Sequence, residues 1–148
     1  MGEKEKVRVK RLRVVLDTNV VISALLFRGE TSRLHTLWKK RAFRIAASRE
    51  IVGEYLRVLA YPKFNLTESE IKGIIQEELL PYIEPVTVSE KSDGVCVDLD
   101  DDKFLACAEA AKADAIVSGD AHLLSLKSFK GCPIETAEWF LRKFRQGS

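Results

Sequence analysis

The stretch Arg13-Val14-Val15-Leu16-Asp17-Thr18-Asn19-Val20 decides the fold expected of this chain. A short apolar run ends in three polar residues, and a second apolar run, Val20 to Phe27, follows at once. The first run predicts a buried strand. The second predicts a helix, with Asn19 or Thr18 as its expected N-cap. Asp17 therefore ends a strand at the carboxyl edge of a sheet, where open α/β sheets bind ligands.

The same pattern recurs later, in Ala115-Ile116-Val117-Ser118-Gly119-Asp120. An apolar run again leads to an aspartate, and a helix-like run follows. A single aspartate in such a position is often only a helix cap, so Asp17 alone does not indicate a site. Two strands that each bring an aspartate to the same edge of one sheet predict a shared site.

Strands and helices are expected to alternate along the rest of the chain, which predicts an α/β fold with a parallel sheet covered on both faces. Further strands are expected over 42–47, 82–88, 114–118 and 133–136, and further helices over 31–40, 48–61, 67–80, 100–113, 121–126 and 137–144. We expect a basic N-terminal segment, residues 1–12, and a single domain over 13–144.

Composition narrows the class of protein. The chain has 148 residues, 46% of them hydrophobic, which suits one domain with one core. No apolar run approaches the roughly 20 residues that cross a bilayer, and the polar N-terminus does not resemble a signal peptide. We therefore expect a cytoplasmic protein. Three widely spaced cysteines predict neither a zinc site nor a disulfide framework.

Glu54 is a third carboxylate of interest. It lies at helical spacing between Ile51 and Val58, so it borders the apolar stripe of its helix although an exposed face was available. The alternative interpretation is an ion pair with Arg49 or Arg57.

The fourth acidic feature is the run Asp98-Leu99-Asp100-Asp101-Asp102 at the start of a predicted helix. Acids in a first helical turn are stabilised by the helix dipole and often have no other role. Four acids in five residues exceed what capping requires, so we expect Asp101 or Asp102 to face the edge of the sheet. Carboxylates that converge without His or Cys form an oxygen-only site suited to Mg²⁺ or Mn²⁺. A phosphodiester is the natural substrate class for such a site.

In order and spacing, these stretches resemble a PIN domain, and more closely the VapC-type toxins of toxin–antitoxin pairs. The likeness runs from Val14 to about Leu141. It is carried by Leu16-Asp17-Thr18-Asn19, Ser48-x-x-Ile51-x-x-Glu54, Asp98-Leu99-Asp100-Asp101-Asp102-Lys103-Phe104-Leu105, and Ile116-Val117-Ser118-Gly119-Asp120 followed by His122-Leu123-Leu124. The resemblance implies a three-layer α/β/α sandwich and a metal-dependent endoribonuclease.

Carried over by motif, the resemblance implies a catalytic quartet of Asp17, Glu54, Asp101 and Asp120, of which Asp17, Asp101 and Asp120 bind the metal. Asn19 and Ser118 match positions that orient ligands or water. Asp102 competes with Asp101, because the acidic run aligns in either register. The resemblance further implies RNA as substrate, a homodimer and an inhibitory antitoxin protein, with no membrane partner. No residue is assigned to RNA binding.

Three other interpretations stay open. The first is a phosphotransferase that forms an aspartyl-phosphate on Asp17, although Asn19 stands where a second aspartate would be wanted. The second is a non-catalytic module that binds RNA or a protein on the same fold. The third is an RNA-processing nuclease outside any toxin–antitoxin pair.

Overall fold

The computed structural model describes residues 11–89 and 99–145, apart from the side chains of residues 99–101 and 145. Within these ranges six strands form one sheet: β1 (Leu12–Leu16), β2 (Phe43–Ser48), β3 (Ile83–Val86), β4 (Ala115–Val117), β5 (Ser128–Phe129) and β6 (Cys132–Glu135). All neighbouring strands run parallel except β5, which pairs antiparallel with β6. The structure thus confirms the predicted α/β fold.

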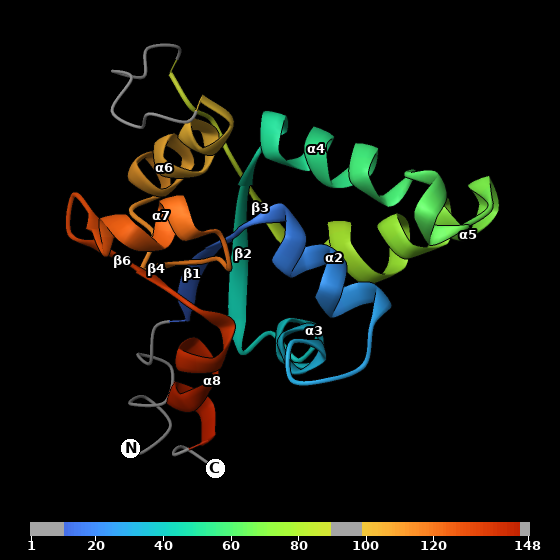
Figure 1. Ribbon diagram of the computed structural model, residues 1–148, viewed down its shortest axis with the longest axis horizontal. Coiled ribbons are helices and arrows are strands. Elements are labelled where there is room, and N and C mark those ends of the chain that lie inside the picture. The colour runs from blue at the N-terminus through green and yellow to red at the C-terminus, as the bar shows by residue number, and fades with distance from the viewer. Residues whose placement is uncertain (1–10, 90–98, 146–148) are drawn as a thin grey trace, which may run out of the picture.

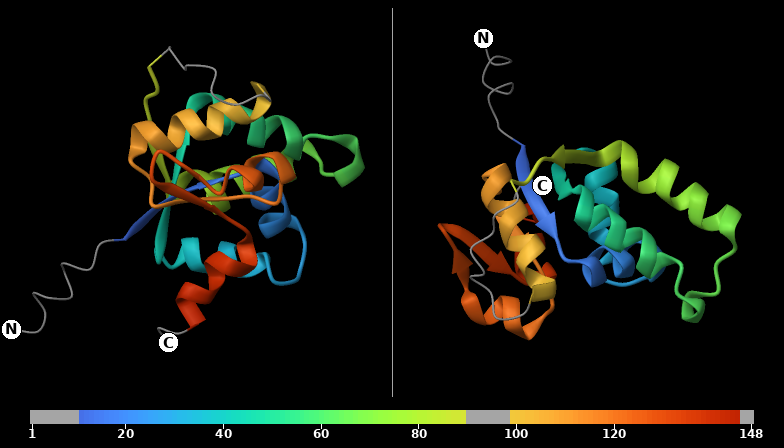
Figure 2. Two further views of the ribbon diagram at one scale, coloured as in Figure 1. Left: turned by 60° about the vertical axis from the view of Figure 1, so that its left-hand side comes forward. Right: turned by 90° about the horizontal axis from the view of Figure 1, so that it is seen from above.

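The helices of the same ranges cover both faces of the sheet. They are α2 (Thr18–Leu26), α3 (Ser32–Lys39), α4 (Arg49–Leu59), α5 (Glu68–Gly73), α6 (Leu99–Ala111), α7 (Ala121–Leu126) and α8 (Ala137–Arg145). Helices α2, α3 and α5 lie on one side of β1 and β2, and α6 and α7 lie on the other (Figure 1). Elements α4 and α5 extend beyond the sheet on the side away from α6 (Figure 2). These layers form the expected α/β/α sandwich.

The strand order, β3-β2-β1-β4-β6-β5, determines where the carboxyl edge of the sheet opens. From β1 the chain builds outward to β2 and β3, then returns to the other side of β1 to form β4. The ends of β1 and β4 are therefore a topological switch point, where helices leave toward opposite faces and a crevice forms. Asp17 directly follows β1, and Ser118 directly follows β4.

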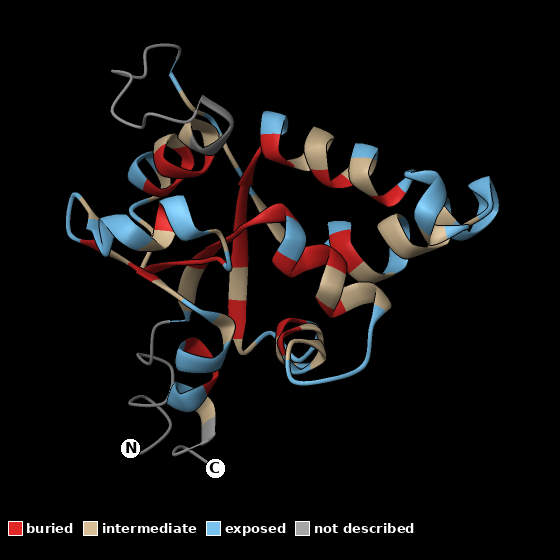
Figure 3. Ribbon diagram, in the orientation of Figure 1, coloured by how far each residue is buried: buried red, intermediate tan, exposed pale blue. Residues whose placement is uncertain are grey.

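The core is centred on β1, β2 and β4, whose residues are mostly buried (Figure 3). Val14, Val15 and Leu16 have no exposed surface, as expected for a parallel strand covered on both faces. Trp38 and Tyr55 are among the largest fully buried side chains. A core built this way holds the ends of the central strands in fixed positions.

Helix α2 begins one or two residues earlier than predicted. Its N-cap is Asp17, whose carbonyl accepts the amides of Val20 and Val21 at 3.0 and 3.2 Å. The prediction of Thr18 or Asn19 as the cap is therefore wrong. The Asp17 side chain makes no capping hydrogen bond, so its carboxylate is used elsewhere.

The helix predicted over 67–80 is divided. Thr67 and Glu70 form a capping box for α5, which ends at Gly73. A π-helical segment, η2 (Ile74–Leu79), and a 3₁₀ turn, η3 (Leu80–Tyr82), follow. Pro81 of η3 has no amide to donate, and the carbonyl of Glu78 accepts the indole N–H of Trp38 at 2.9 Å. Regular helical bonding therefore stops before Pro81.

None of the helices that the structure describes is both long and apolar enough to span a membrane. The predicted boundary between a basic segment over 1–12 and a domain over 13–144 stays a prediction, since most of that segment lies outside the described ranges.

Candidate active site

Asp17 and Ser118 come together because β1 and β4 are adjacent. The amide of Asp17 donates to the carbonyl of Val117 at 3.0 Å, which aligns the ends of the two strands. The Ser118 hydroxyl then donates to Oδ2 of Asp17 at 2.7 Å. The two residues are 8% and 1% exposed. The strand-end motifs identified in the sequence therefore meet through a short, buried hydrogen bond to a carboxylate.

Asp120 joins this pair through the same hydroxyl. Its amide donates to Oγ of Ser118 at 2.9 Å, so Ser118 bridges the two aspartates. Oδ1 of Asp120 accepts the amide of His122 at 2.8 Å and caps the short helix α7. One oxygen of Asp120 is thus held in place by the fold, and this fixes the direction of its carboxylate.

A pocket of about 370 Å³ lies over these residues. Its wall includes Asp17, Asn19, Ser118 and Asp120. Further residues of α2, the residue Thr31 and the start of α8 complete it. The exposed Asn19 lies in this wall, as expected for a residue that orients a ligand. The predicted strand-end pair and two predicted neighbours thus line one cavity.

The electrostatics of Asp17 are those of a crowded, buried acid. Burial raises the pKa of Asp17 above its ordinary value of 3.8, and the negative charges of Asp120 and Glu54 raise it further, while the hydrogen bond from Ser118 opposes the rise. A positive ion at this position would relieve both the burial of charge and the repulsion.

Glu54 is tied to the site by two short contacts. Its Oε2 accepts the Thr18 hydroxyl at 2.7 Å, and its Oε1 lies 2.7 Å from Nζ of Lys103. Burial alone raises the pKa of Glu54, but the bonds from Lys103 and Thr18 outweigh it, so the pKa lies below its ordinary value of 4.5. The sequence offered Arg49 or Arg57 as the ion-pair partner of Glu54. In the structure the partner in contact is Lys103 of α6, and the charge of Arg57 adds a smaller stabilisation of the Glu54 anion.

Sequence reasoning missed Lys103. A lysine near the N-terminal end of α6 is placed unfavourably in the field of the helix dipole. A lysine at this position indicates that a nearby carboxylate balances its positive charge. The side chain of Lys103 is only 8% exposed, which is unusual for a lysine and requires a partner such as Glu54.

Tyr55 fixes α4 to the end of β1. Its hydroxyl donates to the carbonyl of Leu16 at 2.6 Å, and the ring has no exposed surface. Because Tyr55 follows Glu54 in the sequence, this bond also sets the height of Glu54 relative to Asp17.

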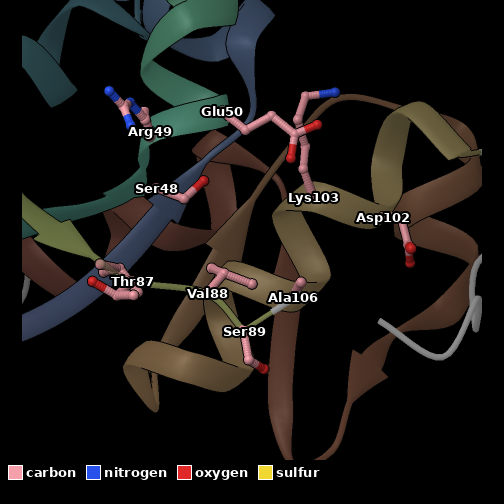
Figure 4. Close-up of a pocket in the computed structure, with 10 residues that line it drawn as sticks. Ser48, Arg49, Glu50, Thr87, Val88, Ser89, Asp102, Lys103 and Ala106 are labelled. Atoms are coloured by element: carbon pink, nitrogen blue, oxygen red, sulfur yellow. The ribbon is translucent and has the colours of Figure 1, made fainter. Parts of the chain in front are cut away.

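The acidic run at the start of α6 is seen only in part. The side chain of Asp101 lies outside the described residues, so its predicted role is not tested. Asp102 is half-buried and lines a second, larger pocket of about 640 Å³ with Ser48, Glu50 and Lys103. Asp102 and Lys103 extend in different directions from α6 (Figure 4).

The side chains that the structure describes include no group of three or more His, Cys, Asp or Glu placed to hold one metal ion. The Asp17 and Asp120 carboxylates suit a cation that needs few protein ligands and keeps water in its remaining positions. Mg²⁺ commonly keeps several waters and uses only one or two carboxylates. An oxygen-only donor set with two acids and an accessible pocket therefore suits Mg²⁺ or Mn²⁺ better than a softer metal.

A model of the PIN domain family matches residues 13–122. The chain therefore belongs to the PIN domain family, whose members are generally nucleases. No curated protein matches the chain.

Among solved structures, the chain is similar to one in the crystal structure of VapBC2 from Rickettsia felis bound to a DNA fragment from their promoter. The TM-score is 0.56 at 18% identity, over 84% of this chain and 98% of that chain. It is also similar to PAE2754 from Pyrobaculum aerophilum, with a TM-score of 0.54 at 15% identity, over 89% of this chain and 88% of that chain. At these identities the likeness shows the shared fold.

Proposed function

We propose that this PIN domain is a divalent-metal-dependent endoribonuclease whose active site is the pocket over Asp17, Ser118 and Asp120. The observation that carries the proposal is the buried Asp17 carboxylate. It lies at the switch point of the sheet, is held by Ser118 and faces a cavity with a second carboxylate in its wall. A fold gains nothing in stability from a buried acid beside another acid, so a functional role is the better explanation.

Asp17 and Asp120 would hold the cation, and Asp101 is the third ligand that the family resemblance implies. When bound, Mg²⁺ or Mn²⁺ supplies positive charge that neutralises a phosphodiester and stabilises its displacement. Ser118 keeps the Asp17 carboxylate in one orientation through its hydroxyl. Asn19, at the rim of the pocket, offers an amide that can donate to a phosphate oxygen or a water.

The proposed substrate is RNA, cut by water to leave a 5′-phosphate and a 3′-hydroxyl. A product with a cyclic phosphate would contradict this, because it requires attack by the ribose 2′-hydroxyl instead of by water. Among the residues that the structure describes, the wall of this pocket contains no His or Lys that could activate that hydroxyl.

We further propose that the protein is the cytoplasmic toxin of a toxin–antitoxin pair, acting as a homodimer held by an antitoxin. The fold shared with VapBC2 of Rickettsia felis supports this role. An RNA-processing nuclease has the same site but needs no antitoxin. A growth assay separates the two, since induced expression of a toxin arrests growth and expression of its Asp17→Asn variant does not.

The direct test incubates the purified protein with a mixed RNA pool in Mn²⁺, in Mg²⁺ and in EDTA. Asp17→Asn serves as the control for contaminating nuclease. The proposal predicts cleavage that needs a divalent metal, is lost in the variant and leaves 5′-phosphates. Equal cleavage by wild type and variant would mean that the activity is contamination, and the non-catalytic binding module would then be the better interpretation.

A further inference from the structure

Both carboxylate oxygens of Glu54 are already bonded within the protein. Nζ of Lys103 lies 2.7 Å from Oε1, and the Thr18 hydroxyl donates to Oε2 at 2.7 Å. The Lys103 side chain is 8% exposed and that of Glu54 is 24% exposed, so the pair is largely shielded from water. Thr18 is buried and directly follows Asp17. A continuous chain of contacts therefore runs from α6 through α4 to the first turn of α2.

From this geometry we infer that Lys103 is a resident cation for Glu54, and that the two act as positioning residues for Thr18 and Asp17 instead of holding a divalent ion. The inference rests on the proposed metal site at Asp17 and Asp120. It revises the role that the family resemblance implies for Glu54.

The cost of the alternative supports the inference. A divalent ion on Glu54 would have to displace an ammonium with little access to water, and separating an ion pair that is largely shielded from water is unfavourable. Lys103 also neutralises Glu54 locally, so it removes one of the negative charges that a divalent ion would otherwise relieve. The low pKa of Glu54 agrees, since the carboxylate is stabilised as an anion by protein groups alone.

The test compares Mn²⁺ affinity, measured by isothermal titration calorimetry, in the wild type, Asp17→Asn and the double variant Glu54→Gln/Lys103→Met. The double variant removes one charge of each sign, and its glutamine still accepts the Thr18 hydroxyl. Because opposite charges at one place cancel, we expect its Mn²⁺ affinity to stay within about threefold of wild type. Asp17→Asn should weaken binding by at least about tenfold, because a ligand charge is lost.

The single variant Lys103→Met provides the sharper prediction. It removes the positive charge in contact with Glu54 and leaves only the weaker influence of Arg57, so Mn²⁺ should bind roughly three- to tenfold more tightly. Lys103→Arg keeps the positive charge and should bind like wild type. A purely structural lysine would alter stability in Lys103→Met without tightening Mn²⁺ binding.

Two results overturn the inference. If the double variant loses Mn²⁺ as severely as Asp17→Asn, then Glu54 is a ligand. If Lys103→Met binds Mn²⁺ no more tightly than wild type, Lys103 is not its counter-ion.

Failure of the proposed metal site would look different, since wild type and Asp17→Asn would then bind Mn²⁺ alike. The Lys103–Glu54 pair is decided in that case by thermal unfolding in EDTA. The losses of unfolding free energy are measured in Glu54→Gln, in Lys103→Met and in the double variant. If the two single losses do not add up to the loss of the double variant, the pair is supported, and if they do add up, it is refuted.

Discussion

Replacing Ser118 by alanine tests how the site is held together. The Ser118 hydroxyl donates to Oδ2 of Asp17 at 2.7 Å and accepts the amide of Asp120 at 2.9 Å, and Ser118 is 1% exposed. The change deletes a single oxygen, so it leaves little cavity. It removes the donor to a buried carboxylate and leaves the amide of Asp120 without its partner.

The expected cost follows from these two contacts. A hydrogen bond to a charged group contributes about 1.5–3 kcal/mol. The amide of Asp120 is only partly buried, and water replaces much of that second bond. We therefore expect Ser118→Ala to lower the free energy of unfolding by about 2–3 kcal/mol. For a chain of this size that lowers Tm by roughly 5–10 °C.

The assay is thermal unfolding in EDTA at about pH 8, where an ordinary carboxyl is ionised. Ser125→Ala is a matched control, because its hydroxyl donates to the carbonyl of His122 at 2.7 Å on an exposed surface. That control should change the free energy of unfolding by under about 0.5 kcal/mol.

The effect of Ser118→Ala should shrink to about 1 kcal/mol in an Asp17→Asn background, because the lost hydrogen bond is then neutral. The reasoning is refuted if Ser118→Ala costs no more than Ser125→Ala, or if it costs the same with and without the Asp17 charge.

Three further predictions concern stability. Because burial raises the pKa of Asp17 above its ordinary value of 3.8, the charged carboxylate destabilises the fold above the folded-state pKa, and this penalty vanishes as pH falls below the unfolded-state value. Asp17→Asn should therefore raise Tm in EDTA near neutral pH, with a gain that fades in melts toward pH 3.8; a gain independent of pH would contradict the prediction. Tyr55→Phe removes the buried bond to the carbonyl of Leu16 and should cost about 1–2 kcal/mol in urea unfolding, whereas an unchanged midpoint would exclude a role for this bond. Thr67→Ala deletes the capping box shared with Glu70 and should cost about 1 kcal/mol in the same assay, and a loss below about 0.3 kcal/mol would show that α5 does not depend on its cap.

The central strands were predictable because their residues repeat one local pattern. Val14 to Leu16 and Ala115 to Val117 are short apolar runs that end in polar residues, and each is buried in a parallel strand. Asp17 and Ser118 follow these runs directly, so topology alone brings them to the same edge. The strand-end half of the site therefore follows from local sequence.

Contacts across the layers were not predictable in this way. The alternative interpretation of Glu54 was an ion pair with a residue of its own helix, Arg49 or Arg57. The actual partner, Lys103, comes from α6, which is far from Glu54 in the sequence, and no local pattern indicates such a contact. The strand β5 (Ser128–Phe129) was also not predicted, because two residues are too few to show an alternation of apolar and polar side chains.

The helix predicted over 67–80 ends where it was expected to end, before Pro81, which lacks an amide. Its interior differs from the prediction, because α-helical bonding stops at Gly73 and a π-helical segment follows from Ile74 to Leu79. Apolar spacing indicates a helical segment but does not identify which carbonyl each amide binds, so this change was not predictable.

The most direct test of the central claim is an anomalous difference map from crystals of the protein soaked in Mn²⁺. The account predicts a peak in the pocket between the Asp17 and Asp120 carboxylates, with Lys103 still paired to Glu54. A map without a peak at these two carboxylates, at Mn²⁺ concentrations that support cleavage of RNA, would contradict it.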